Sequence, residues 1–243
     1  MQRSDNLFEL QAKISLRGHG LEDLIREVLG RFPLVGVGST IVMRHRFDPA
    51  ETLDLIDRHS VTNVHLVPTQ FVRMLKLPDE VRATFDGSSL QTVLHGAAPC
   101  PPEVKRAMLE WWGPVVGEYY GGTEAGFLTL CTGAEWLERP GSIGRETAMA
   151  EVAVLREDGT TAAPGEAGQI WFRSRVGADF EYHNAPDKTA AAHRGDGWGT
   201  LGDVGFLEED GHLFLSDRKI DMIISGGVNI YPAEIEGVLV THP

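Results

Sequence analysis

The first half of the chain alternates between short apolar runs, which are typical of buried strands, and apolar positions at helical spacing. From Gly20 to Phe32 the helical spacing predicts an amphipathic helix. The apolar runs predict strands at Ser39–Met43, Val64–Val67, Leu90–Leu94 and Val115–Tyr119. Further helices are expected to begin at Pro49 (capped by Asp48), Pro68 and Pro101. Strands that alternate with helices predict an α/β fold, with a parallel sheet and helical crossovers.

The pattern changes at about Gly141. Short β runs now follow one another and are separated by turn dipeptides such as Asp158-Gly159 and Asp210-Gly211. These runs are Val152–Leu155, Gly168–Arg173 and His212–Leu215, with a last strand at Ile220–Ile224 and the beginning of a helix at Pro232. The second half therefore predicts a smaller antiparallel β region.

One short segment combines several chemistries: Tyr120-Gly121-Gly122-Thr123-Glu124, preceded by Glu118-Tyr119. Two glycines let a backbone approach a ligand closely, and a hydroxyl can donate to a phosphate oxygen. A carboxylate can hold Mg²⁺, which prefers oxygen ligands and keeps its phosphate partner, and an aromatic ring can stack on a base. The segment suits a magnesium nucleotide; the alternative is a glycine turn after a strand, with a capping threonine and a solvated glutamate.

A second candidate segment is the run of small residues Gly96-Ala97-Ala98, which follows a predicted strand. Ligands of parallel sheets bind at the carboxyl ends of the strands. We expect this run and the segment Tyr120–Glu124 to lie just past two strand ends, where such a ligand binds. The alternative for the small residues is tight packing between a strand and a helix.

The order of these segments resembles the adenylate-forming superfamily, which comprises acyl-CoA synthetases, luciferases and the adenylation domains of peptide synthetases. The resemblance covers roughly residues 34–243 and also rests on Trp198–Asp203, Asp217–Asp221 and Ser225–Glu236. It implies a partial large domain, a small antiparallel β subdomain and a stub of the C-terminal domain. The implied division is a helical segment outside the family (1–33), an α/β subdomain (34–140), a β-rich subdomain (141–216) and the hinge with the truncated C-terminal domain (217–243).

The resemblance also implies roles for individual residues. Gly96, Ala97, Ala98 and Tyr120 would enclose the adenine, Glu118 would lie near its exocyclic amine, and Tyr119 and Gly121 would belong to the same nucleotide-binding segment. Thr123 and Glu124 would bind the α-phosphate and Mg²⁺. Asp203 would bind the ribose, Arg218 the ribose or phosphate, and Gly226 and Gly227 would line the channel for coenzyme A. A turn aspartate, a surface salt bridge and a glycine turn are the alternatives for Asp203, Arg218 and the last two glycines. The hinge falls at Lys219 or Ile220.

The implied activity is ATP-dependent activation of a small carboxylic acid to an acyl-adenylate and then to an acyl-CoA. Glu118–Glu124, with Glu135-Trp136 before Pro140-Gly141-Ser142, looks most like bacterial fatty-acid or steroid-side-chain ligases. The superfamily's phosphate-binding loop and its C-terminal catalytic lysine are not found, so we expect a ligase truncated at both ends, with low activity. The alternatives are a non-catalytic nucleotide-binding or interaction protein and, disfavoured because no carrier domain follows, a peptide-synthetase domain.

Composition narrows the class of partner. A net charge of −13 argues against a general nucleic-acid or anionic-membrane binder, because both need a positive face. The two cysteines, Cys100 and Cys131, form neither a disulfide framework nor a metal cluster, and Cys100 reads as a packed residue. The sequence has no apolar run that could span a bilayer and no signal peptide, so we expect a cytoplasmic protein. The oligomeric state stays open.

Overall fold

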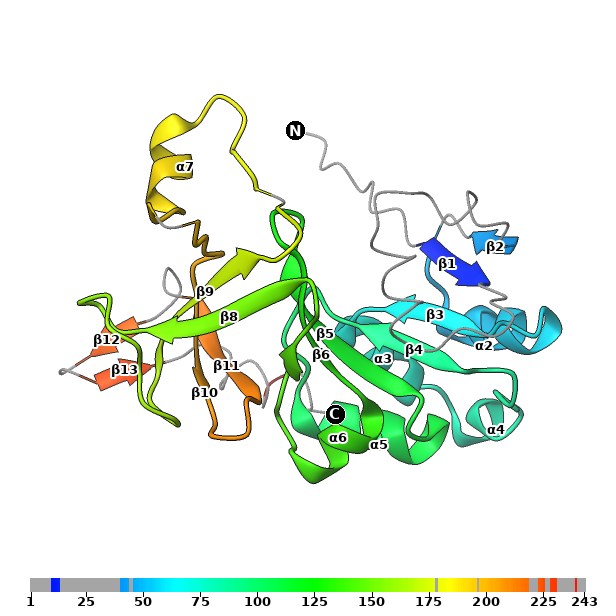
Figure 1. Cartoon of the computed structure of the whole chain (residues 1–243). Coiled ribbons are helices and arrows are strands. Elements are labelled where there is room, and N and C mark those ends of the chain that lie inside the picture. Colours follow the sequence, from blue (N-terminus) through cyan, green and yellow to red (C-terminus); the bar gives the residue numbers. More distant parts are fainter. Residues whose placement is uncertain are drawn as a thin grey trace. The chain divides into compact units, whose positions relative to one another are not determined.

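The computed structural model describes residues 10–13, 40–43, 46–177, 179–195, 197–218, 223–225, 228–230 and 239 (Figure 1). The predicted helix at Gly20–Phe32, the hinge at Lys219 and Ile220, and nearly all of the predicted terminal helix lie outside these residues. Among the residues that are described, no helix has both the length and the apolar character to cross a membrane.

The described chain divides into two compact units. The first unit comprises residues up to His95 together with Ala107–Val116, and the second comprises Gly96–Arg106 together with Gly117 onward. The elements of the first unit are β1 (Leu10–Lys13), β2 (Thr40–Met43), α2 (Pro49–Arg58), β3 (Asn63–Leu66), α3 (Pro68–Leu75), α4 (Asp79–Arg82) and β4 (Thr92–His95). The boundary of the two units falls within α5 (Pro102–Trp112).

Parallel pairing is confirmed in the first unit. Strands β3 and β4 run parallel, with Asn63 opposite Thr92 and Leu66 opposite His95, and α3 and α4 lie between them in the chain. Strand β2 confirms the predicted strand at Ser39–Met43, and it pairs antiparallel with β1, which the sequence analysis did not predict.

Local sequence signals explain where the helices of this unit begin. The Asp48 side chain accepts a hydrogen bond from the backbone N–H of Glu51 at 2.8 Å, and Pro49 occupies the first helical position of α2. Helix α3 begins at Pro68, where the Gln70 side chain accepts from the Val67 N–H at 2.8 Å. Both helices then bury an apolar face, which includes Leu53, Ile56, Phe71 and Met74.

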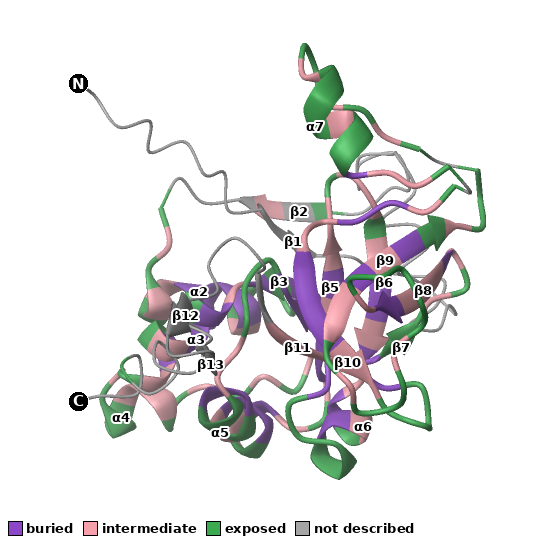
Figure 2. Ribbon diagram, turned by 90° about the vertical axis from the view of Figure 1, so that its left-hand side faces the viewer, coloured by how far each residue is buried: buried purple, intermediate pink, exposed green. Residues whose placement is uncertain are grey.

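The second unit is built mainly from antiparallel strands. Its elements are β5 (Val116–Gly122), β6 (Gly126–Cys131), α6 (Gly133–Glu138), β7 (Arg145–Glu146), β8 (Ala150–Leu155), β9 (Gly168–Ser174), α7 (Pro186–Ala191), β10 (Asp203–Leu207), β11 (Leu213–Arg218), β12 (Ile223–Ser225) and β13 (Val228–Ile230). Strands β11-β10-β9-β8 form a four-stranded antiparallel sheet, which confirms the predicted β region. Figure 2 shows buried positions along β5 and β6, whereas α7 buries no residue.

One core holds this unit together. Its buried members are Tyr120, Leu128, Ile143, Ala150, Val154, Ile170, Phe172 and Leu213. Strands β5, β6, β8, β9 and β11 all contribute to it, so the hairpin of β5 and β6 and the four-stranded sheet share apolar contacts. The expected domain boundaries, including the one at residue 140, stay predictions.

The expected course of β5 is wrong in one respect. The strand does not end at Tyr119 but continues through Gly122 and pairs antiparallel with β6, with a register shift between Tyr120 and Gly121. Only residues 123–125 form the turn. The α/β fold is confirmed, but its strand pairing is mixed: β3 and β4 pair in parallel, whereas β5, β6 and β7 pair antiparallel.

The cap of α2 gives the first testable prediction. Asp48→Ala removes the acceptor for the Glu51 N–H, so we expect the free energy of unfolding to fall by about 1 kcal/mol. Asp48→Asn is the matched control, because asparagine caps helices about as well as aspartate. Urea denaturation measures both, and equal midpoints for the two variants would contradict the cap's contribution.

Candidate functional site

The hairpin of β5 and β6 carries most of the residues that the sequence singles out. A Cβ on Gly121 would lie 1.9 Å from the carbonyl oxygen of Gly126, so no side chain fits there. A Cβ on Gly122 would lie 3.1 Å from Oε2 of Glu124, so the carboxylate lies beside Gly122 in the space that a side chain would occupy. The turn presents Thr123 exposed and Glu124 half-buried. Gly121 is thus needed for close backbone contact between the strands, and Gly122 leaves room for the Glu124 carboxylate.

The small residues after β4 are not equivalent to one another. A Cβ on Gly96 would lie 2.6 Å from the ring of Tyr119, so Gly96 serves close packing against that ring. Ala97 has a φ of 66°, a left-handed conformation that costs a residue with a side chain about 1–2 kcal/mol. Such outliers cluster at functional sites. Ala97 and Ala98 are exposed, so their small surface is open to a ligand.

Tyr119 itself points to the side of β5 opposite its two neighbours, because successive strand residues alternate between faces. Its ring packs on Phe127 of β6, with the two centroids 3.9 Å apart. It is half-buried, and burial raises the pKa of its phenol above the usual range. Its hydroxyl therefore stays protonated at neutral pH.

A hydrogen bond joins Tyr120 to Asp203, two predicted site residues that lie 83 positions apart in the sequence. The Tyr120 hydroxyl donates to Oδ2 of Asp203 at 2.7 Å, and both residues are buried, with 8% and 6% of their surface exposed. Asp203 begins β10 directly after a turn in which Thr200 accepts from the Gly202 N–H at 3.0 Å. The fold thus brings the aromatic segment and the carboxylate expected at the ribose into direct contact.

Glu118 is paired with a lysine that the sequence analysis did not single out. The Nζ atom of Lys105 lies 3.4 Å from Oε2 of Glu118, and the Lys105 side chain is fully buried. Burial raises the pKa of Glu118 to about 7 against the opposing charge of Lys105, and burial lowers the pKa of Lys105. One signal could have found this lysine: it lies three and four positions before Met108 and Leu109, on the buried face of α5.

Neither cysteine is a nucleophile in this setting. Burial, with a smaller contribution from the charge of Glu118, raises the pKa of the Cys100 thiol to about 12. Burial also raises the pKa of the Cys131 thiol to about 12. Because the thiolate is the attacking form, both residues are held as protonated thiols at neutral pH, which agrees with Cys100 as a packed residue.

Tyr182 is a second residue that sequence reasoning missed. Its hydroxyl donates to Oε1 of Glu124 at 3.1 Å. The two residues lie 58 positions apart and no local pattern links them, so only the fold could identify the contact.

The carboxylate of Glu124 fits a magnesium ion of the kind that accompanies a nucleotide. Within the described ranges, no group of three or more histidine, cysteine, aspartate or glutamate side chains could form an all-protein metal site. Mg²⁺ on a nucleotide is commonly held by one or two carboxylates, with phosphate oxygens and water as its other ligands. One accessible carboxylate at the tip of a glycine hairpin meets that requirement.

The remaining predicted residues are only partly described. Arg218 ends β11, and the backbone register sets it opposite Asp203. Gly226 and Gly227 lie outside the described residues. Their expected roles stay predictions.

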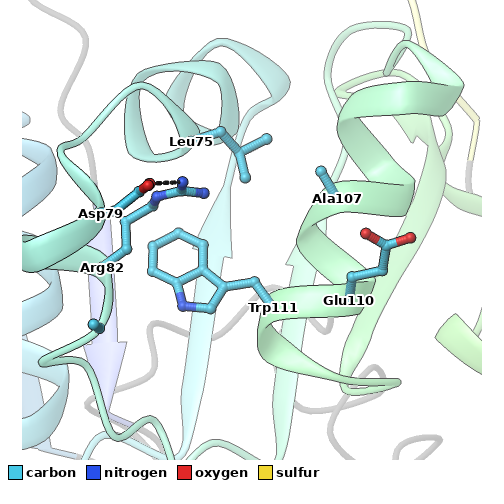
Figure 3. A pocket seen from close by; sticks show the side chains of 7 residues that line it. Leu75, Asp79, Arg82, Ala107, Glu110 and Trp111 are labelled. Carbon is cyan, nitrogen blue, oxygen red and sulfur yellow. Dashed lines mark hydrogen bonds and ion pairs between the residues drawn. The ribbon is translucent and has the colours of Figure 1, made fainter.

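The first unit has a surface groove of about 390 Å³ (Figure 3). Its lining residues are Leu75, Asp79, Arg82, Ala83, Ala107, Glu110 and Trp111. Asp79 and Arg82 form an ion pair, and the Arg82 guanidinium lies 5.9 Å from the ring centre of Trp111. None of the predicted site residues lines it.

The fold and these contacts define an α/β protein whose glycine hairpin and small-residue turn suit a nucleotide. A model of the family described as AMP-binding enzyme matches residues 25–178, and the chain belongs to this family. It is 37% identical to a medium/long-chain-fatty-acid–CoA ligase of Mycobacterium tuberculosis over 87% of this chain and 37% of the relative. The chain spans about two fifths of the length of the relatives it matches.

Solved structures agree with this assignment. The amide bond synthetase of Marinactinospora thermotolerans superimposes with a TM-score of 0.74 at 35% identity, over 82% of this chain and 41% of that one. The O-succinylbenzoate coenzyme A synthetase of Bacillus subtilis, in complex with ATP and magnesium ion, gives a TM-score of 0.72 at 32% identity, over 85% and 42%.

The buried pair gives the second testable prediction. Lys105→Met leaves Glu118 without its positive partner, so we expect the free energy of unfolding to fall by about 3–5 kcal/mol at neutral pH. Lys105→Met with Glu118→Met should recover most of this loss, because replacing a buried pair by apolar residues is often neutral. Arg106→Met, an exposed position on the same helix, is the control and should cost about 1 kcal/mol or less.

The loss caused by Lys105→Met should also depend on pH. A carboxyl whose pKa is raised in the folded state stabilises that state below its unfolded pKa of 4.5, and this stability is lost as the pH rises through the folded value of about 7. Removing Lys105 raises the pKa of Glu118 further, so the loss should be larger at pH 8 than at pH 5. Urea titrations at both pH values measure it, and a loss independent of pH would contradict the pairing.

The contact between Tyr120 and Asp203 gives the third prediction. Tyr120→Phe keeps the ring in the core but removes the donor to a buried carboxylate, so we expect the free energy of unfolding to fall by about 2 kcal/mol. Asp203→Asn keeps an acceptor oxygen and should cost less. Thermal unfolding of both variants tests the bond, and a Tyr120→Phe protein as stable as the wild type would show that the bond adds nothing.

Proposed function

We propose that this chain contributes to the activation of a carboxylic acid by ATP, with an acyl-adenylate as the product of that step. The observation that carries the proposal is the Tyr120–Asp203 hydrogen bond, which joins the aromatic end of the glycine hairpin to the carboxylate expected at the ribose. Membership of the AMP-binding family and the structural likeness to a synthetase in complex with ATP and magnesium ion support the same reading.

The proposed roles divide between two segments. The exposed Ala97 and Ala98, which follow the buried Gly96, would offer a flat surface to one face of the adenine. The hairpin residues Tyr119, Tyr120 and Gly121 would border the rest of the base, with Glu118 near the exocyclic amine. Asp203 would accept hydrogen bonds from the ribose hydroxyls, since a carboxylate has two oxygens at a spacing that suits a vicinal diol. Arg218, opposite Asp203 in the sheet, would assist at the ribose or phosphate.

Thr123 and Glu124 would help to offset the negative charge that builds up at the α-phosphate. When a carboxylate attacks the α-phosphorus, two anions approach one another, and hydroxyl donors and a cation must offset the charge that builds up. Thr123 would donate to the α-phosphate and Glu124 would hold Mg²⁺, which supplies positive charge when bound. No general base is required, because the attacking carboxylate is already ionised at neutral pH.

The proposal extends to the acid that is activated and to the acceptor of the acyl group. We propose a fatty or steroid-side-chain acid, because the segment Glu118–Glu124 resembles ligases for those acids and one relative is a fatty-acid–CoA ligase. Coenzyme A is the proposed acceptor, with Gly226 and Gly227 along its channel and a hinge at Lys219 or Ile220. An amide bond synthetase has a similar fold, so the fold alone does not select coenzyme A.

The test of the proposed function separates binding from chemistry. AMP binding is titrated calorimetrically for the wild type and for Asp203→Ala, and acid-dependent pyrophosphate release from Mg-ATP is measured with fatty, steroid and aromatic acids. We expect the wild type to bind AMP and Asp203→Ala to bind it at least 10-fold more weakly, because the ribose loses a charged acceptor.

Asp158→Ala is the matched control, since this aspartate lies in a fully exposed turn between β8 and β9. Acid-dependent release by the wild type would establish the adenylation step. AMP binding without release for any acid would favour the alternative, a nucleotide-binding protein without chemistry. A wild-type chain that binds no AMP would contradict both.

A further inference from the structure

An arm of the second unit, defined as residues 179–193 and including α7 (yellow in Figure 1), carries the tyrosine that contacts Glu124. Its own side chains fix its shape. His193 bonds the carbonyl oxygen of Thr189 through Nδ1 at 2.7 Å and a carboxylate oxygen of Asp179 through Nε2 at 2.9 Å. Because both partners are acceptors, the protonated imidazolium satisfies them best, and these bonds raise the pKa of His193.

The arm holds Tyr182 at both its backbone and its ring. The Tyr182 N–H donates to the Thr189 hydroxyl at 2.9 Å, and that hydroxyl donates to the Ala185 carbonyl at 3.1 Å. The Phe180 ring meets the Tyr182 ring edge to face at 5.5 Å, and the Lys188 Nζ lies 3.8 Å from the ring centre. The ring is therefore packed within the arm, and its hydroxyl contacts Glu124 of the hairpin.

At the hairpin, the two oxygens of Glu124 have different surroundings. Oε1 accepts the hydrogen bond from Tyr182 at 3.1 Å. Oε2 lies beside Gly122, where a Cβ would come within 3.1 Å of it. In this contact the phenol hydroxyl is the donor and the carboxylate oxygen is the acceptor. One oxygen of the carboxylate thus accepts a hydrogen bond from the arm, and the other lies in the space that the missing side chain of Gly122 leaves.

We propose that Tyr182 is a positioning residue for the magnesium site: its hydroxyl fixes the Glu124 carboxylate so that the second oxygen can bind Mg²⁺ on the nucleotide phosphates. The inference rests on the proposed function, since it takes Glu124 as the metal carboxylate. Carboxylates that bind metals are themselves commonly hydrogen-bonded, and removing such a partner typically costs 10–100-fold in metal affinity.

This arrangement also links the arm to the phosphate region. Tyr182 and Glu124 lie 58 positions apart in the sequence, yet a hydrogen bond couples them. A disturbance of the arm, such as loss of the His193–Asp179 bond, would reach Glu124 through Tyr182. The effect should appear in the affinity for the magnesium nucleotide and not in the affinity for the nucleotide alone.

The test uses Tyr182→Phe, which keeps the packed ring and removes only the hydroxyl. Calorimetry measures the Kd of ATP with excess Mg²⁺ and again in EDTA, for the wild type and the variant. We expect Tyr182→Phe to weaken Mg-ATP binding by about 10-fold and to leave metal-free ATP binding unchanged. Circular dichroism and the thermal midpoint establish that the variant is folded.

A double-mutant cycle with Glu124→Gln separates positioning from packing. If Tyr182 acts through Glu124, Tyr182→Phe should have no further effect on Mg-ATP affinity in the Glu124→Gln background. An equal loss in both backgrounds, or an equal loss with and without Mg²⁺, would mean that Tyr182 supports structure only and would overturn the inference. Unchanged Mg-ATP affinity in Tyr182→Phe would overturn it as well.

The outcomes also distinguish this inference from the proposed function. A wild type that binds ATP more tightly with Mg²⁺, together with a Tyr182→Phe protein that behaves identically, overturns the inference and leaves the proposed function standing. A wild type that binds no ATP under either condition overturns both.

Discussion

The candidate site depends on the close approach of β5 and β6 at Gly121 and Gly126. A Cβ at Gly121 would lie 1.9 Å from a backbone carbonyl oxygen, and a backbone group in a paired strand cannot move aside as a flexible side chain can. The hairpin therefore requires glycine at Gly121, and its pairing sets the direction of the side chains from Glu118 to Tyr120, while Thr123 and Glu124 lie in the turn that the two strands enclose. The neighbouring Tyr120 and Leu128 anchor the same hairpin in the core of the second unit.

Three carboxylates of the second unit are each paired with a hydrogen-bond donor. Glu118 faces Lys105, Asp203 faces the hydroxyl of Tyr120, and Glu124 faces the hydroxyl of Tyr182. Removing a charged group from water is costly unless it is paired, so these donors help to offset the burial of Glu118 and Asp203 and the partial burial of Glu124. The gain is preorganisation: carboxylates that are already oriented need little rearrangement when a ligand arrives.

Local signals in the sequence predicted local structure well. Asp48 and Pro49 start α2 as their chemistry requires, and the turn dipeptides of the second half separate antiparallel strands as expected. The end of β5 was misplaced because glycines that permit a turn also permit close strand pairing, and the β6 partner was not recognised as a strand. The pairs Tyr120–Asp203 and Tyr182–Glu124 had no local signal, since each joins residues more than 50 positions apart.

The resemblance to a family identified candidate site residues that the hydrophobic periodicity could not. It selected Asp203 and Glu124 from many acidic residues, and the structure then showed that each has a tyrosine hydroxyl as partner. Lys105 and Tyr182 were selected by neither route. Lys105 could have been noticed as a charge on the apolar face of α5, whereas Tyr182 required the arm to be folded against the hairpin.

The central claim is that the hairpin, the turn after β4 and the start of β10 together form a nucleotide site. Residue-resolved NMR of the labelled chain during an AMP titration tests it most directly. The account predicts saturable amide shifts that concentrate at Gly96–Ala98, Tyr120–Glu124 and Asp203. Shifts that concentrate instead around the groove at Trp111, or no shifts at millimolar AMP, would contradict it.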